Sequence, residues 1–291
     1  MDAKWDVGGV ITPPARVPWE TRAIRRAVHK IATRLVLWRL LLSPPFDGPA
    51  NMALDDALLA RARRTGEAVL RTYAWAAPTM SFGRNQRARG VYDPDALRAA
   101  RVTAVRRPTG GRALLHHGEI TYSVTAPTGT GESGTRLYAR INALLASALA
   151  TLGVPVVVAA PSRRAAAPTG LPCFAEPSAG ELTYEGRKLV GSAQYREDGA
   201  VLQHGSILVD DDQARIPALM LAPTRRIPPP ATLRAILGRA PSASEVHEAL
   251  AEAVLRMQGA APKPLELDPD TRAIADRLAD HYRDPAWTWR R

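Results

Sequence analysis

Residues 106–119 read RRPTGGRALLHHGE and join two segments that are rich in β-branched and apolar residues, 102–107 and 119–125. The paired glycines Gly110 and Gly111 allow backbone N–H groups to approach a ligand closely. The arginines on either side suit an anionic or carbonyl oxygen. The sequence therefore predicts a ligand-binding loop between two strands, and the alternative is a tight hairpin with solvated arginines.

The chain has a single cysteine, Cys173, in the stretch LPCFAEP at 171–177. One cysteine excludes an intrachain disulfide and the Cys₄ and Cys₂His₂ zinc sites. Most inert cysteines are buried in apolar runs, whereas this thiol stands between two prolines in a polar loop. It is a candidate nucleophile if a cation or a base lies beside it, and an inert thiol if none does.

A third stretch, YEGRKLVGSAQ at 184–194, predicts a hairpin turn that delivers Lys188 onto a strand. The small residues Gly191, Ser192 and Ala193 would leave room for a ligand chain along this strand. If Lys188 points inward, its charge would stabilise a thiolate at Cys173. The alternative is a solvated lysine in a turn.

The stretch LQHGSIL at 202–208 interrupts an apolar strand with His204 and Gly205, a pattern typical of a bulge or a close backbone approach. The alternative is a core histidine with satisfied hydrogen bonds. Nothing in the spacing of His116, His117 and His204 requires a metal, and none is expected.

Periodicity predicts helices that alternate with short strands, which is typical of an α/β enzyme. Helices are expected at 52–64 after Asn51, at 94–100 after the N-cap Asp93, and at 137–152, 244–257 and 271–282. Strands are expected at 69–75, 79–82, 102–107, 119–125, 154–159, 181–184, 189–195 and 201–209, and no β signal follows residue 210.

The same pattern divides the chain into three parts: a basic N-terminal extension at 1–34, a catalytic domain at 35–221 and a small helical C-terminal region at 222–291 that follows a Pro-rich linker at 227–230. A start of translation downstream of the extension is the alternative reading of residues 1–34. An Arg-, Ala- and Pro-containing loop at 162–172 is expected to lead to Cys173.

The 291 residues carry a net charge of +11, of which +5 lies in residues 1–45. The remaining arginines are scattered and few aromatic residues lie among them, so a nucleic-acid surface is not indicated. An acidic protein partner explains the charge equally well. No apolar run is long enough to span a bilayer, and a cytoplasmic location is expected.

Taken in order, these stretches resemble the lipoate/biotin protein ligase superfamily, and within it the cysteine-dependent LipM-type octanoyltransferases. The resemblance runs from about residue 40 to residue 209. It also includes NMALD at 51–55, LRTYAW at 70–75, SFGRNQ at 81–86 and QHGS at 203–206. A departure is His117, because relatives usually carry an acidic residue after the histidine.

The resemblance implies a mixed β-sheet flanked by helices, akin to class II synthetase and biotin–lipoate ligase catalytic domains. It implies a transferase of protein lipoylation in which Cys173 forms an acyl thioester assisted by Lys188, without a cofactor. The donor would be an acyl carrier protein and the acceptor a lipoyl-domain or glycine cleavage H-type protein. The substrate-binding residues would be Arg107, Gly110, Gly111, Arg112, His116, Gly191, Ser192, Ala193, His204 and Gly205.

Three other functions compete with this one. An ATP-dependent lipoate–protein ligase would use the same glycine loop without needing the cysteine, and an octanoyl amidotransferase would move the acyl group between lipoylated proteins through a cysteine. A non-catalytic acyl-protein binder is disfavoured because both Cys173 and Lys188 are present.

Overall fold

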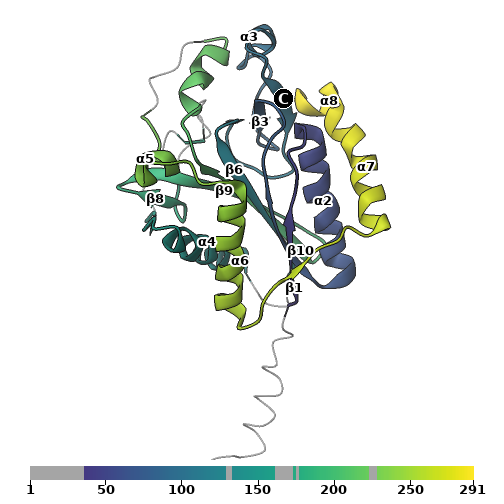
Figure 1. The fold of residues 1–291 in the computed structure, drawn as a ribbon. Helices are drawn as coiled ribbons and strands as arrows, with labels where there is room; N and C mark the ends of the chain where they lie inside the picture. The colour runs from purple at the N-terminus through teal and green to yellow at the C-terminus, as the bar shows by residue number, and fades with distance from the viewer. Residues whose placement is uncertain (1–35, 129–132, 161–172, 175–176, 223–227) are drawn as a thin grey trace, which may run out of the picture. The chain divides into compact units, whose positions relative to one another are not determined.

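The core of the protein is an eight-stranded mixed sheet with the strand order β11-β1-β2-β6-β10-β9-β8-β7 (Figure 1). The computed structural model describes residues 36–128, 133–160, 173–174, 177–222 and 228–291. β1 runs parallel to both of its neighbours, β2 and β11, and the other pairs are antiparallel. The strands are β1 (Trp38–Leu42), β2 (Ala68–Tyr73), β6 (Glu119–Pro127), β7 (Val157–Val158), β8 (Leu182–Tyr184), β9 (Arg187–Glu197), β10 (Ala200–Leu208) and β11 (Lys263–Pro264).

A smaller sheet, β4-β3-β5, is formed by Thr79–Phe82 (β3), Thr103–Arg106 (β4) and Leu114–His116 (β5). β3 pairs in parallel with β4 and antiparallel with β5. The predicted glycine loop follows β4 as expected, but the strand at its end is β5, which the sequence did not predict. The predicted strand at 119–125 is β6.

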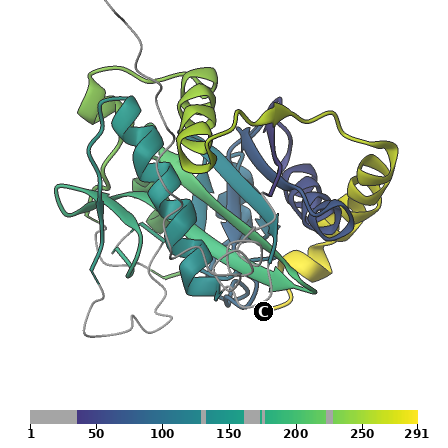
Figure 2. The ribbon, with the colours of Figure 1, turned by 90° about the horizontal axis from the view of Figure 1, so that it is seen from below.

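Two layers of helices cover the two faces of the large sheet (Figures 1 and 2). α4 (Gly134–Thr151) and α6 (Ala243–Gln258) pack on one face, and α2 (Gly48–Thr65) packs on the other, with α7 (Pro269–Arg283) against it. The alternation of side chains along β2 explains this, because Val69 packs with α2 whereas Leu70 packs in the cluster that contains α4 and α6. The shorter helices are α3 (Pro94–Ala99), the 3₁₀ helix η1 (Gln213–Leu219), α5 (Leu233–Leu237) and α8 (Pro285–Thr288).

The segment from Val36 to Arg291 forms one compact unit. Within it, the residues after 227 supply β11 at the edge of the sheet as well as α6 and α7. None of the helices in the described ranges is long and apolar enough to cross a membrane. The predicted extension at 1–34 and the predicted loop at 162–172 lie outside the described residues.

Most predicted elements are present. The sequence did not predict β1, β5, β11, η1, α5 or α8, and α2 and β7 are among the elements whose bounds differ. α2 begins at Gly48 and not at Met52, because the side chain of Asp47 accepts a hydrogen bond from the Ala50 amide at 2.8 Å and caps the helix. The two-residue strand β11 was not predicted, since two residues show no periodicity. β7 is shorter than the predicted strand at 154–159.

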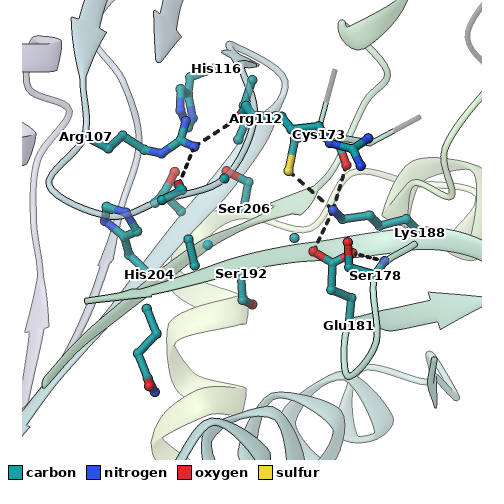
Figure 3. A pocket seen from close by; sticks show the side chains of 18 of the residues that line it. Arg107, Arg112, His116, Cys173, Ser178, Glu181, Lys188, Ser192, His204 and Ser206 are labelled. Atoms are coloured by element: carbon teal, nitrogen blue, oxygen red, sulfur yellow. Dashed lines mark hydrogen bonds and ion pairs between the residues drawn. The ribbon is translucent and has the colours of Figure 1, made fainter. Parts of the chain in front are cut away.

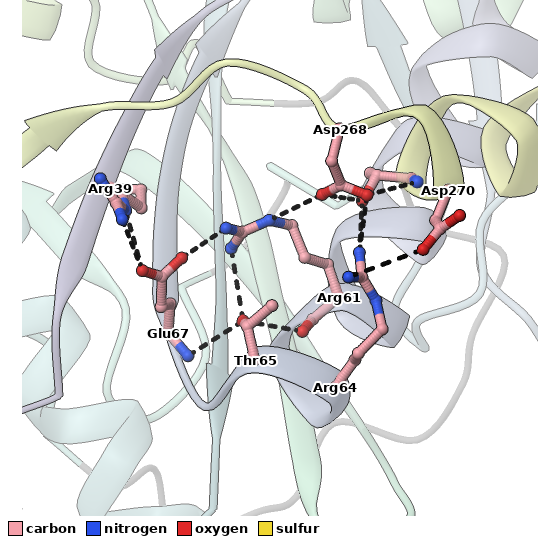
Figure 4. A network of polar contacts seen from close by, with 8 residues as sticks. Arg39, Arg61, Arg64, Thr65, Glu67, Asp268 and Asp270 are labelled. Atoms are coloured by element: carbon pink, nitrogen blue, oxygen red, sulfur yellow. Dashed lines mark hydrogen bonds and ion pairs between the residues drawn. The ribbon is translucent and has the colours of Figure 1, made fainter.

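A polar network joins β1, the start of β2, α2 and α7 (Figure 4). Glu67 accepts two hydrogen bonds from Arg39, at 2.7 and 3.0 Å, and one from Arg61. Arg61 in turn lies 3.4 Å from the carboxylate of Asp268, which caps α7. These contacts are largely shielded from solvent, so they contribute more than ordinary surface ion pairs.

We expect Glu67→Gln to lower the free energy of unfolding at pH 7 by about 1–2 kcal/mol, because two guanidinium groups lose their shared anion. The hydrogen bonds from Arg39, followed by those from Arg61, hold the pKa of Glu67 below its ordinary value despite burial. This contribution is therefore present at neutral pH and disappears as the pH falls below about 4. Urea unfolding at pH 7 and pH 3 measures it, and the exposed Glu266→Gln serves as the control. An equal loss at both pH values would contradict the prediction.

Candidate active site

A cavity of about 510 Å³ opens between the glycine loop and the strands β9 and β10 (Figure 3). It is lined by the predicted site residues, which come from four separate stretches of the sequence. The lining includes Arg107, Gly110, Gly111, Arg112, His116, Cys173, Lys188, Gly191, Ser192, Ala193, His204 and Gly205. The structure therefore brings together every residue that was predicted to be catalytic or substrate-binding, while their individual roles stay predictions. Arg106 and His117 are not among the residues that line the cavity.

Cys173 and Lys188 are direct neighbours in this cavity. The Lys188 Nζ donates hydrogen bonds to the Cys173 Sγ at 3.3 Å and to the Cys173 carbonyl oxygen at 2.8 Å. The Cys173 amide donates to the Ala113 carbonyl at 2.9 Å, which ties the thiol-bearing residue to the end of the glycine loop. Lys188 is thus directed inward from β9, as the sequence analysis expected for a lysine that serves the thiol.

A third group, Glu181, completes this cluster. Its Oε1 lies 2.7 Å from the Lys188 Nζ, and its Oε2 accepts a hydrogen bond from the Ser178 amide at 2.7 Å. Burial lowers the pKa of Lys188, but the charges of Cys173 and Glu181 together outweigh burial, and the pKa lies above its ordinary value. Lys188 is therefore an ammonium ion in the resting site.

Two buried histidines hold the glycine loop. His204 on β10 lies with its Nδ1 3.0 Å from Asp55 and with its Nε2 2.7 Å from the hydroxyl of Thr109 in the loop. Asp55 is fully buried and also contacts Arg71 at 2.8 Å. Burial raises the pKa of Asp55, but Arg71, His204 and the hydroxyl of Ser123 together outweigh burial, so the pKa lies below its ordinary value and the carboxylate stays charged. This chain of hydrogen bonds connects α2 to the loop across β10.

His116 forms the second connection. Its Nδ1 lies 2.6 Å from Glu119 and its Nε2 2.6 Å from the hydroxyl of Ser81, which also accepts a hydrogen bond from Arg107. Burial lowers the pKa of His116 in spite of Glu119. The neutral ring therefore donates from Nδ1 and accepts at Nε2, an assignment that follows from the hydrogen-bond partners.

His117, where the sequence departs from the family it resembles, does not line the cavity. The side chain of His117 is exposed, and the acidic partner of the site histidine is Glu119, two residues further on. The same carboxylate accepts a hydrogen bond from the His117 amide at 2.9 Å. The loop therefore keeps a carboxylate–histidine pair although the position next to His116 is not acidic.

Glycines make the cavity possible where β9 and β10 pair. A Cβ at Gly205 would lie 2.2 Å from the backbone oxygen of Gly191, so a side chain there would force the two strands apart. A Cβ at Gly191 would lie 2.9 Å from the Lys188 Cε and 3.2 Å from the ring of Phe174. The absence of a side chain at both positions therefore leaves open the space that forms the cavity.

Several residues of this site were not predicted from the sequence. Glu181 was predicted only as part of a strand. Its role as the partner of Lys188 becomes visible in the structure, where both side chains are buried. Asp55 appeared only as part of a helix, although an aspartate on its apolar face signals a buried partner. The cavity is also lined by Met52, Tyr73, Trp75, Leu114, Thr121, Tyr138, Ser178, Gln194 and Ser206.

Residues 47–255 match the family described as the lipoyl protein ligase A/B catalytic domain. The chain belongs to this family. It is 40% identical to an octanoyltransferase LipM of Kyrpidia tusciae over 87% of this chain and 99% of that relative. It is 38% identical to an octanoyltransferase LipM of Symbiobacterium thermophilum, over 87% and 98%, and 32% identical to one of Staphylococcus aureus, over 87% and 99%. The predicted acyltransferase of the octanoyltransferase type is confirmed.

Solved structures confirm the predicted fold. A putative lipoate protein ligase of T. acidophilum with bound lipoic acid superposes with a TM-score of 0.73 at 21% identity, covering 87% of this chain and 100% of that one. A lipoate-protein ligase A bound with ATP gives a TM-score of 0.71 at 22% identity, covering 87% and 99%. At these identities the likeness establishes the fold alone.

We expect Gly191→Ala to slow octanoyl transfer by at least about tenfold while the protein remains folded. The added methyl meets the flexible end of Lys188, which can move, and this movement takes the ammonium away from the Cys173 sulfur. Gly205→Ala should in addition lower the melting temperature, because its methyl meets backbone. Initial rates and thermal unfolding of both variants test this, and a wild-type rate for Gly191→Ala would contradict it.

Proposed function

We propose that Cys173 takes an octanoyl group from an acyl carrier protein as a thioester and passes it to a lysine of a lipoyl-domain protein. Octanoyl transfer in lipoate biosynthesis is supported by the LipM relatives. The observation that carries the role of Cys173 is the ammonium of Lys188, 3.3 Å from its sulfur in a cavity that borders the glycine loop.

In the first step the Cys173 thiolate attacks the carbonyl carbon of the donor thioester. A new carbon–sulfur bond forms, the donor's carbon–sulfur bond breaks, and the donor thiolate leaves with the electron pair. One thioester replaces another, so the exchange is nearly balanced in free energy and consumes no ATP. Lys188 stabilises the attacking thiolate by its charge.

In the second step the amine of the acceptor lysine attacks the carbonyl carbon of the enzyme thioester. A carbon–nitrogen bond forms, Cys173 leaves as a thiolate beside the Lys188 ammonium, and the proton of the amine passes to solvent. The ammonium thus serves both steps, because the same thiolate is first the nucleophile and then the leaving group. Lys188 keeps its proton throughout.

The cavity suits a medium-length acyl chain. Its walls include Met52 and Leu114, and the small residues of β9 leave a path along the sheet. A lipoyl-domain or glycine cleavage H-type protein as acceptor, and a carrier protein as donor, would be drawn by the net charge of +11 if they are acidic. A cytoplasmic location agrees with such partners.

Two alternatives use the same fold. An ATP-dependent lipoate–protein ligase does not need a thiol, so the Cys173–Lys188 contact favours the transferase. An octanoyl amidotransferase would use the same cysteine with a lipoylated protein as donor. Assays with each donor separate these two cysteine-dependent functions.

We expect Cys173→Ala and Cys173→Ser to abolish transfer from octanoyl carrier protein while the fold is kept, because thioester capture requires the sulfur. Intact mass after incubation with octanoyl carrier protein and no ATP should show one octanoyl group on the wild type and none on either variant. Undiminished transfer by Cys173→Ala would exclude Cys173 as the residue that carries the acyl group.

We expect Lys188→Ala to slow capture of the acyl group by about 100-fold and to shift the alkylation of Cys173 by iodoacetamide to higher pH, because the thiolate loses its neighbouring charge. Lys188→Arg keeps the charge but not the compact ammonium, so it should recover part of the alkylation and little of the turnover. The pH profile of alkylation measures this. An unchanged profile for Lys188→Ala would separate the lysine from the thiolate.

A further inference from the structure

We propose that Glu181 is a positioning residue that keeps Lys188 protonated while Cys173 carries the acyl group, and that it thereby prevents the acyl group from passing to Lys188 itself. The inference rests on the proposed thioester at Cys173. It assigns a function to a buried carboxylate that the two transfer steps do not otherwise use.

The danger to the enzyme lies in the distance between sulfur and amine. The Lys188 Nζ is 3.3 Å from the Sγ that holds the thioester, and both groups lie in one cavity. The acyl carbon is bonded directly to this sulfur, so it would lie within reach of the amine, and groups held in such proximity react with effective concentrations of roughly 10⁵–10⁸ M. A neutral amine at this position would therefore compete with any acceptor lysine that arrives from solution.

The side reaction is chemically balanced and ends the catalytic cycle. The amine nitrogen would form a bond to the acyl carbon, the carbon–sulfur bond would break, and the proton released by the nitrogen would pass to the Cys173 sulfur. The product is an amide on Lys188 and a free thiol. An amide is not reversed by a second thiol, so the enzyme would be inactivated.

Protonation removes this danger because an ammonium ion has no lone pair. The three N–H groups of Lys188 have three acceptors in the resting site: the Cys173 sulfur, the Cys173 carbonyl oxygen and Glu181. Once acylated, the sulfur cannot carry a negative charge. The carbonyl oxygen and the Glu181 carboxylate remain, and only the carboxylate is charged.

Because both side chains are buried, the charge of Glu181 has a large effect on the protonation of Lys188. The Lys188 side chain is 1% exposed and that of Glu181 is 6% exposed. Besides Cys173 and Glu181, the groups that face Lys188 in the described part of the chain are the ring of Phe174, 4.7 Å from Nζ, and the phenol of Tyr138, which is neutral near pH 7. Burial lowers the pKa of Lys188, and after acylation the charge of Glu181 opposes this effect.

Glu181 is itself held in place. Its second oxygen is fixed by the Ser178 amide, and it precedes β8, the strand that pairs with the segment carrying Lys188. Thr183 is the cross-strand neighbour of Lys188, and Glu181 lies two residues before it, on the other side of a register shift between Leu182 and Thr183. The carboxylate therefore stays beside the ammonium whether or not the sulfur is acylated.

The test loads the full-length protein with octanoyl carrier protein and follows its intact mass before and after treatment with hydroxylamine. Hydroxylamine cleaves a thioester and leaves an amide. The wild type should carry one sensitive octanoyl group. Glu181→Gln should convert this group to a resistant one roughly tenfold faster than the wild type, since one unit in pKa changes the neutral fraction tenfold. The conversion should be faster at higher pH, and transfer activity should fall as the resistant product accumulates.

The sequence makes the product easy to locate. The chain contains only four lysines, Lys4, Lys30, Lys188 and Lys263, so peptide mapping assigns the amide without ambiguity. Glu181→Asp keeps the charge and should keep the wild-type behaviour. Glu185→Gln, which removes an exposed carboxylate from the nearby hairpin turn, is the matched control. Glu181→Gln combined with Lys188→Arg should give no resistant product at this position.

A second measurement covers the case in which Glu181→Gln captures acyl groups poorly. Alkylation of Cys173 with iodoacetamide makes the sulfur neutral, and the titration of Lys188 is then followed by nuclear magnetic resonance of ¹³C-labelled lysine. Lys188 should lose its proton at lower pH in the Gln variant than in the wild type.

The outcomes separate the two proposals. A sensitive adduct in Glu181→Gln that never becomes resistant, or equal titration of Lys188 in both alkylated proteins, would overturn the role of Glu181 and leave the thioester mechanism standing. The absence of any sensitive adduct on the wild type would instead overturn the mechanism on which the role rests.

Discussion

The buried ammonium of Lys188 is the constraint on which the active site depends. A charge removed from water is tolerated only if opposite charges and hydrogen-bond acceptors replace the lost solvent. Lys188 meets that requirement with Glu181, with the Cys173 carbonyl oxygen and with the sulfur. Cys173 and Glu181, which stands just before β8, therefore both contact the Nζ of Lys188 on β9. The interactions that stabilise the buried ammonium also position the reactive sulfur.

The same requirement organises the opposite wall of the cavity. Arg71 and Asp55 are both fully buried and neutralise each other, and His204 extends their pair to Thr109 in the glycine loop. The packing of α2 against the sheet excludes water from the Arg71–Asp55 pair, and the free energy of this packing offsets the desolvation cost of the two charges. The charged side chains of this site are therefore held inside the fold and do not lie on its surface.

The sequence permits prediction of the parts of the site that depend on local chemistry. Cys173 is conspicuous between prolines, Lys188 follows a hairpin turn, and Gly110 and Gly111 form a paired turn. It does not reveal Glu181, because the register between β8 and β9 shifts between Leu182 and Thr183, and such an irregularity leaves no periodic pattern. Likewise β11 pairs with β1 through two residues, so its presence depends on tertiary packing and not on propensity.

The two histidines that hold the glycine loop have a consequence for the thermodynamics of recognition. Thr109 is bonded to His204, and Arg107 is bonded to Ser81, whose hydroxyl is shared with His116, so the loop is ordered before any acyl chain arrives. Binding at this wall costs little conformational entropy, and the affinity for the chain reflects the apolar area that it buries. Acyl chains of different length are then distinguished at the far end of the cavity. Each methylene that fits there contributes about 0.8 kcal/mol to binding, whereas one that does not fit clashes with packed side chains.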